Sequence, residues 1–282
     1  MSMSDKLSSR KNIKKSPGKT SFFHRLDVRF PWLKLAAVCL LGFIAIIDLL
    51  DLTVSKLSDP YDKIRIAPMS YHVRVTKRVL EGKMLVALTF DDGPSSATTP
   101  KLLDILYAED VPATFFMLGN MARNNPDIVR RAESEGHTIA SHTMYHQNLI
   151  RISTAAVRSD INEASTVFKD ILGHLPTLTR PPYGNFNSTI GSIIGTPLIL
   201  WSVDTLDWKN KSTDAIMETT LSQVHDGAII LMHDIHPTTV ETVPTLISTL
   251  RSLGYEFVTV PELVEIRGKK LTSGAAYYNF RP

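Results

Sequence analysis

Two histidines four residues apart, His142 and His146 in the string S-H-T-M-Y-H, are the side chains best suited to bind a metal ion. In a helix, a spacing of four returns to the same face, so both imidazoles would point at one ion. A carboxylate is the usual third ligand, and the adjacent Asp91 and Asp92 in T-F-D-D-G-P offer one. Two histidines and one carboxylate leave coordination positions open, and an open position is where a metal ion does chemistry.

Three further motifs place polar groups between apolar segments: R-P-P-Y-G at 180–184, V-D-T-L-D-W at 203–208 and L-M-H-D at 231–234. Each motif also has an ordinary structural interpretation. The two prolines could hold a rigid loop, and Trp208 could be a core residue beside an aspartate that caps a helix. His233 could be a buried structural residue at the end of a strand. In the same way, the aspartate pair suits a turn and the two spaced histidines suit an exposed surface. The chemistry therefore depends on whether these groups meet in the fold.

From Lys83 onwards, short apolar runs alternate with amphipathic segments. The apolar runs predict strands at Met84–Phe90, Ala113–Leu118, His137–Ser141, Leu178–Arg180, Leu198–Val203, Ala228–Met232 and Glu256–Thr259. The segments between them predict helices at about 98–109, 126–135, 154–172, 188–194, 212–224, 239–253 and 261–267. In the longest, apolar residues recur every three or four positions and form one buried face: Val157, Ile161, Ala164, Phe168 and Ile171.

This alternation predicts an α/β fold, and more specifically a distorted or incomplete (β/α) barrel of about seven strands. The region is shorter than a regular eight-fold barrel, which favours an incomplete one. All five polar motifs follow predicted strands. Because the carboxyl ends of such strands converge on one face, we expect the five motifs to meet there.

A basic N-terminal segment precedes an apolar run. Residues 1–34 hold nine Lys or Arg and two Asp, and Leu35–Ile47 contains no charge. This pattern predicts a basic cytoplasmic tail at 1–29, a single transmembrane anchor at 30–50, and a spacer and lead-in at 51–82. The later residues would then face outward from the cell membrane. A cleaved signal peptide and a buried helix are the alternatives.

The composition of the chain argues against several other classes of protein. Beyond residue 34 the chain holds 22 basic and 26 acidic residues, so the body of the protein is mildly acidic and does not predict a nucleic-acid partner. The single cysteine, Cys39, lies in the apolar run, so no disulfide within the chain is possible. There is also no G-x-S-x-G string, the usual sign of a serine nucleophile.

Taken in order, the motifs T-F-D-D-G-P, H-T-M-Y-H, R-P-P-Y-G, D-T-L-D-W and L-M-H-D resemble those of the polysaccharide deacetylase family. These are carbohydrate esterases of family 4, which share the NodB homology domain. The resemblance covers residues 83–268 and leaves 269–282 as a C-terminal tail. Any one motif is weak evidence, whereas five in order with compatible spacing are specific.

The resemblance implies one divalent metal ion, usually zinc, bound by three side chains: Asp92, His142 and His146. It implies Asp91 as the general base and His233 as the general acid. Asp207 would keep His233 protonated, and Arg180 would position Asp91.

Three more residues would bind the substrate. The backbone N–H of Tyr183 would stabilise the oxyanion, and Trp208 and Leu231 would line a pocket for the acetyl methyl group. Amide hydrolysis needs such a set: an activated water, a place for negative charge on oxygen, and a proton for the leaving nitrogen.

The motif variants and the tail L-T-S-G-A-A-Y-Y are similar to those of peptidoglycan N-acetylglucosamine deacetylases, and an anchored domain would face a cell wall. The expected substrate is therefore peptidoglycan. Chitin oligosaccharides and O-acetylated xylan are the alternatives. A non-catalytic carbohydrate-binding domain would lack a ligand or a base, and neither is missing. A non-haem iron oxygenase also uses two histidines and one carboxylate, but the second carboxylate and its arginine favour hydrolysis.

Overall fold

The computed structural model describes residues 80 and 82–282. The predicted tail, anchor and nearly all of the spacer lie outside these residues and stay predictions. Within the part that is described, no helix has the length and apolar character needed to cross a membrane.

A parallel sheet forms the centre of the fold. Its order is β3-β2-β1-β6-β5, and β7 also pairs with β1. The strand bounds are β1 Met84–Asp91, β2 Thr114–Met117, β3 Thr138–Ser141, β5 Val203–Asp204, β6 Ala228–His233 and β7 Tyr255–Phe257. A second pair joins β4 (Leu198–Ile199) to β8 (Ala276–Tyr277).

The central strand β1 is buried on both faces after its first residue. Val86, Leu88 and Phe90 belong to one apolar cluster, whereas Leu85 and Ala87 belong to another. Side chains alternate along a strand, so Thr89 and Asp91 continue the face of Leu85 and Ala87. A strand covered on both sides is typical of parallel sheets with helices packed around them.

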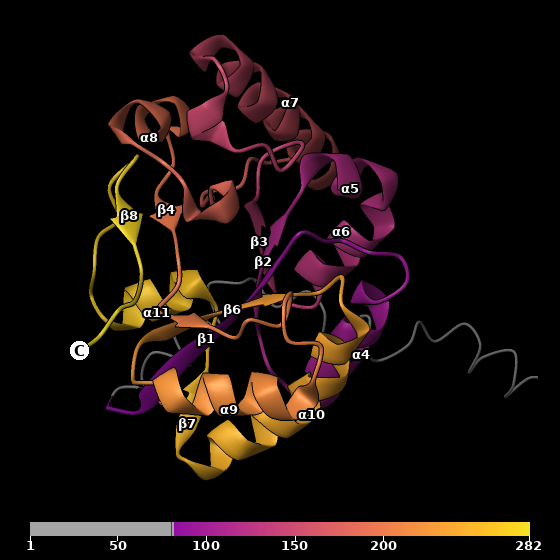
Figure 1. The fold of residues 1–282 in the computed structure, drawn as a ribbon, viewed down its shortest axis with the longest axis vertical. Coiled ribbons are helices and arrows are strands. Elements are labelled where there is room, and N and C mark those ends of the chain that lie inside the picture. The colour runs from indigo at the N-terminus through magenta and orange to yellow at the C-terminus, as the bar shows by residue number, and fades with distance from the viewer. Residues whose placement is uncertain (1–79, 81) are drawn as a thin grey trace, which may run out of the picture. The chain divides into compact units, whose positions relative to one another are not determined.

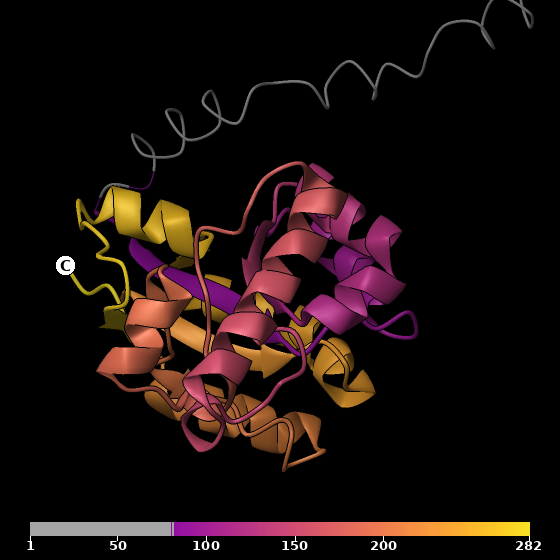
Figure 2. The same cartoon turned by 90° about the horizontal axis from the view of Figure 1, so that it is seen from above.

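Helices surround the central strands in Figure 1, with α9 and α10 side by side. Their bounds are α4 Thr99–Ala108, α5 Gly119–Asn124, α6 Pro126–Ser134, α7 Thr154–Leu172, α8 Ser188–Ile194, α9 Thr213–Gln223, α10 Pro237–Ser252 and α11 Val260–Ile266. Figure 2 shows the long α7 packed beside α5 and α6. This contact matters for the site, because the loop before α7 carries the two spaced histidines.

Isolated bridges extend the ladder beyond β3. Thr179 pairs with both Ser141 and Leu198, and Asn279 pairs with Ala228 of β6. The α/β class with a parallel sheet is therefore confirmed, and the bridges are consistent with an incomplete barrel.

The structure differs from the sequence predictions at several places, and α5 is not among the predicted helices. The predicted strand Leu178–Arg180 contributes only the bridges at Thr179. The predicted strand Leu198–Val203 is two strands, because Leu200 bonds to β8 through the Tyr277 carbonyl whereas Ser202 bonds to β6 through the Ile229 carbonyl. Residues 269–282, expected as a tail, contain β8 and bury Phe280.

Candidate active site

Three proposed metal ligands come together at the carboxyl ends of β1 and β3. Asp92 directly follows β1, and His142 directly follows β3. Asp92 Oδ1 lies 3.5 Å from His142 Nε2 and 3.5 Å from His146 Nε2. One ligand atom from each residue falls within 4.8 Å of the others, which is close enough for all three to reach one ion.

The helical interpretation of the histidine spacing is wrong. Residues 142–146 form a loop, in which Thr143 has φ 71° and His146 has φ 55°. Both values lie in the left-handed region, which a β-branched residue such as threonine rarely adopts. The two imidazoles nevertheless lie close together, with 5.0 Å between their ring centroids.

The chemistry of this donor set fits a metal ion. His142 Nδ1 lies 2.7 Å from the Arg180 carbonyl, which can only accept, so Nδ1 carries the proton and Nε2 is free to ligate. Burial lowers the pKa of His142 to about 3, which keeps the imidazole neutral. Asp92 Oδ1 is buried without a hydrogen-bond partner, and an ion at this point would satisfy it.

Asp91 and Arg180 form a buried ion pair beside the proposed ligands. The guanidinium Nη1 donates to Asp91 Oδ1 at 2.6 Å and to Thr89 Oγ1 at 2.9 Å. Its other nitrogens donate to backbone carbonyls, and Phe116 stacks against it at 4.0 Å. Burial raises the pKa of Asp91, and the Arg180 charge acts against that rise. The hydrogen bond from Arg180 fixes the orientation of the Asp91 carboxylate.

His233 and Asp207 form a second buried pair. Asp207 Oδ1 lies 2.8 Å from His233 Nδ1, and Asp207 Oδ2 accepts from the His233 backbone N–H and from Thr239 Oγ1, both at 2.7 Å. Burial alone would lower the pKa of His233, but the Asp207 hydrogen bond and charge outweigh it and raise that pKa to about 9. The imidazole is therefore held protonated at neutral pH, as a proton donor requires.

The strand register brings the two pairs together. Asp91 and His233 end neighbouring strands and are direct partners in the β1–β6 ladder. Asp91 Oδ2 also lies 3.7 Å from His142 Nε2. A carboxylate that can accept a proton and an imidazolium that can donate one thus border the same metal-ligand cluster.

The proposed substrate-binding residues occupy three different environments. Tyr183 is 60% exposed, and its ring packs on His146 at 4.6 Å between centroids, with its backbone at φ 61°. Trp208 is 52% exposed, so a ligand has access to its ring, whereas Leu231 is buried within β6. Their binding roles stay predictions.

Two buried carboxylates near the site have no role in the sequence predictions, although Asp234 stands in the motif L-M-H-D. Asp234 accepts a hydrogen bond from Thr99, and a Cβ on Gly93 would lie 2.2 Å from its Oδ2, so only glycine fits there. Burial raises the pKa of Asp234 to about 7. Asp160 bonds to the histidine loop. The sequence does contain a sign that Asp160 is buried. It lies three residues after Val157, on the helix face that the apolar pattern assigns to the core.

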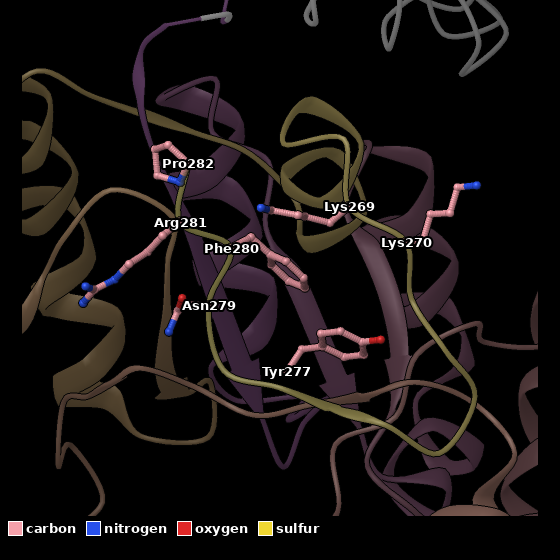
Figure 3. A pocket seen from close by; sticks show the side chains of 7 residues that line it. All are labelled: Lys269, Lys270, Tyr277, Asn279, Phe280, Arg281 and Pro282. Carbon is pink, nitrogen blue, oxygen red and sulfur yellow. The ribbon is translucent and has the colours of Figure 1, made fainter.

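A separate hollow lies among the C-terminal residues (Figure 3). It is lined by Lys269, Lys270, Tyr277, Asn279, Phe280, Arg281 and Pro282. None of these side chains is a histidine or a carboxylate, so this lining offers no counterpart of the metal-ligand cluster.

An α/β fold with a His-His-Asp cluster flanked by an acid–base pair defines a site of the hydrolase class. The sequence model of the polysaccharide deacetylase family matches residues 79–195. The chain is also 45% identical over 194 residues to the peptidoglycan-N-acetylglucosamine deacetylase PgdA of Listeria monocytogenes. That match covers 69% of this chain and 41% of the relative.

Two further proteins are similar over most of their own length. A chitooligosaccharide deacetylase of Bradyrhizobium is 35% identical over 202 residues, which is 65% of this chain and 92% of that protein. The structure of the peptidoglycan deacetylase PdaC of Bacillus subtilis superposes with a TM-score of 0.65 at 37% identity, covering 67% of this chain and 93% of PdaC. The chain belongs to the polysaccharide deacetylase family.

Proposed function

We propose that this protein is a metal-dependent deacetylase that hydrolyses the N-acetyl group of N-acetylglucosamine residues in peptidoglycan and releases acetate. The observation that carries the proposal is the convergence of three groups at the ends of neighbouring strands: the metal-ligand cluster, the Asp91–Arg180 pair and the His233–Asp207 pair. A binding domain would have no use for a base and an acid held beside one cluster of metal ligands.

Asp92, His142 and His146 would hold the metal ion, for which zinc is the leading candidate. When bound, the metal supplies a Lewis acid that activates water and stabilises negative charge on oxygen. Asp91, fixed by Arg180, accepts the proton of the attacking water. His233, kept protonated by Asp207, then donates a proton to the leaving nitrogen.

Other residues bind and orient the acetyl group. The backbone N–H of Tyr183 is proposed to donate to the developing oxyanion, and a donor placed there in advance often contributes a large share of the rate. The left-handed backbone at Tyr183 and the contact of its ring with His146 hold this residue next to the metal ligands. Trp208 and Leu231 are proposed to contact the methyl group.

Peptidoglycan is favoured over the other glycans because two of the similar proteins described above act on it by name. The similarity to a chitooligosaccharide deacetylase keeps chitin oligosaccharides as the second candidate. O-acetylated xylan is the third. All three substrates carry an acetyl group, so the same catalytic residues would serve each of them.

The test is acetate release from three defined glycans: peptidoglycan, chitin oligosaccharides and acetylated xylan. We expect the highest kcat/KM on peptidoglycan. Treatment with a chelator should abolish release on every substrate, because removing the metal removes the Lewis acid, and added zinc should restore it. Enzymatic acetate detection gives the rates.

Three outcomes would contradict the proposal. A preference for chitin oligosaccharides would contradict peptidoglycan as the substrate but would leave deacetylation as the reaction. If activity survives chelation and elemental analysis shows that metal is absent, the reaction does not depend on a metal ion. Tight glycan binding without acetate release would favour a non-catalytic carbohydrate-binding domain.

We also propose that residues 30–50 anchor the catalytic domain on the outer side of the cell membrane. The support is in the sequence, where a basic segment precedes an uncharged apolar run. The full-length protein should resist extraction from membranes by alkaline carbonate, whereas a control lacking residues 30–50 should be released. Release of the full-length chain, or a mass showing cleavage after the apolar run, would contradict the anchor.

A further inference from the structure

We infer that Asp160 is a positioning residue for the metal site, holding the loop that carries His142 and His146 in its ligand-presenting conformation. This inference rests on the metal-binding part of the proposed function. Asp160 lies in α7, outside all five sequence motifs, and accepts a hydrogen bond from the loop that carries both histidines.

The contact between Asp160 and the loop is buried and direct. Asp160 is 4% exposed, and its Oδ1 accepts the Met144 backbone N–H at 2.7 Å. Burial raises the pKa of Asp160, and hydrogen bonds from the backbone N–H groups of Met144 and Tyr145 act against that rise. A charged side chain is seldom buried without a structural or functional reason, and here its hydrogen-bond partner is Met144, two residues before His146.

The loop is held from a second direction by α5. The backbone N–H groups of Gly119 and Asn120 donate to the carbonyls of Thr143 and Met144, at 2.9 and 3.2 Å. The buried Met144 side chain packs so closely that a Cβ on Gly119 would lie 2.5 Å from its sulfur. α5 thus fixes two carbonyls of the loop, and Asp160 fixes the Met144 N–H.

Such restraint is needed because the loop is strained. Thr143 and His146 both have positive φ, on either side of the residues that Asp160 contacts. Residues in this region persist only where the surroundings fix them. Without Asp160, the Met144 N–H would be left buried and unpaired, and the loop would relax towards conformations in which the His146 imidazole no longer faces Asp92.

The test measures zinc affinity of the full chain rather than turnover. Asp160→Ala removes the acceptor, and we expect its zinc Kd to rise by about 10- to 100-fold, as for other residues that orient metal ligands. Asp160→Asn keeps a neutral acceptor, so a smaller rise of about tenfold is expected. Competition with a chromophoric chelator gives Kd, and thermal unfolding of the metal-free variants is recorded in parallel. The matched control is Asp170→Asn, an exposed carboxylate on the same helix.

A purely structural role for Asp160 would lower the unfolding temperature but leave the zinc Kd of the folded protein unchanged. A Kd within about twofold of the unmodified chain in both variants would therefore overturn the inference. If Asp160→Ala does not fold, the isosteric Asp160→Asn decides the question alone. Acetate release does not enter this test, so a failure of the proposed activity would be seen separately.

Discussion

Replacing Asp91 with asparagine should lower kcat by about 10²- to 10⁴-fold while leaving zinc bound. Asparagine has nearly the same shape but cannot accept a proton from water at neutral pH. This change alters none of the three proposed ligands, and Asp91 Oδ2 lies 3.7 Å from His142 Nε2. The loss should therefore appear in turnover of the zinc-loaded enzyme, measured as acetate release at saturating glycan.

Stability must be separated from catalysis in this variant. Asp91→Asn leaves the Arg180 guanidinium, which is 0% exposed, without a charged partner. Removing one member of a buried ion pair costs about 3–5 kcal/mol, and the neutral amide oxygen can still accept one hydrogen bond from Arg180. We therefore expect a lower free energy of unfolding, and kcat should be measured well below the new unfolding temperature.

The matched control for this variant is Asp110→Asn. Asp110 is exposed and has φ 51°, a conformation that asparagine also tolerates, so neither stability nor turnover should change. Near-normal acetate release by folded, zinc-loaded Asp91→Asn would remove Asp91 as the base. Loss of zinc from that variant would instead assign Asp91 to the ligand set.

The meeting of the site residues was predictable from the chain because strand ends are readable in a sequence. Near-continuous apolar runs predicted β1 and β6, and a parallel arrangement places their carboxyl ends together. The ladder accordingly makes Asp91 and His233 direct partners. No detailed side-chain geometry was needed for this step, only the order of elements.

The conformation of the histidine loop was not predictable in the same way. A spacing of four is compatible with a helix, and nothing local in S-H-T-M-Y-H forbids one. The structure has a loop here, and α5 and Asp160 hydrogen-bond to the backbone of Thr143 and Met144. Those partners are distant in sequence, so the positive φ values are imposed by tertiary contacts.

A similar limit applies to the segment Leu198–Val203. Its composition predicts one strand, yet successive parts bond to β8 and to β6. The two-residue strand β8 carries no strong apolar pattern of its own, and it exists because Leu198 and Ile199 provide partners. Short strands of this kind depend on pairing rather than on intrinsic propensity.

Replacing Asp207 with asparagine should remove the alkaline part of the activity profile. Asp207 raises the pKa of His233 to about 9 against the effect of burial, so the unmodified enzyme should keep its proton donor well above neutral pH. Without the Asp207 charge, that pKa should fall to or below the ordinary value of about 6.5. The protonated fraction at pH 8 would then drop by roughly 30-fold or more, and kcat with it.

The pH dependence of the activity loss distinguishes a change in the pKa of His233 from simple misplacement of its side chain. Asp207 also holds the His233 backbone N–H and Thr239, so Asp207→Asn should cost some activity at every pH. A loss through misplacement alone would be equal at pH 5.5 and pH 8, whereas a lowered pKa predicts a small loss at pH 5.5 and a large one at pH 8. The exposed Asp214→Asn is the control and should keep the normal profile. A pH-independent loss in Asp207→Asn would mean that Asp207 orients His233 without setting its protonation.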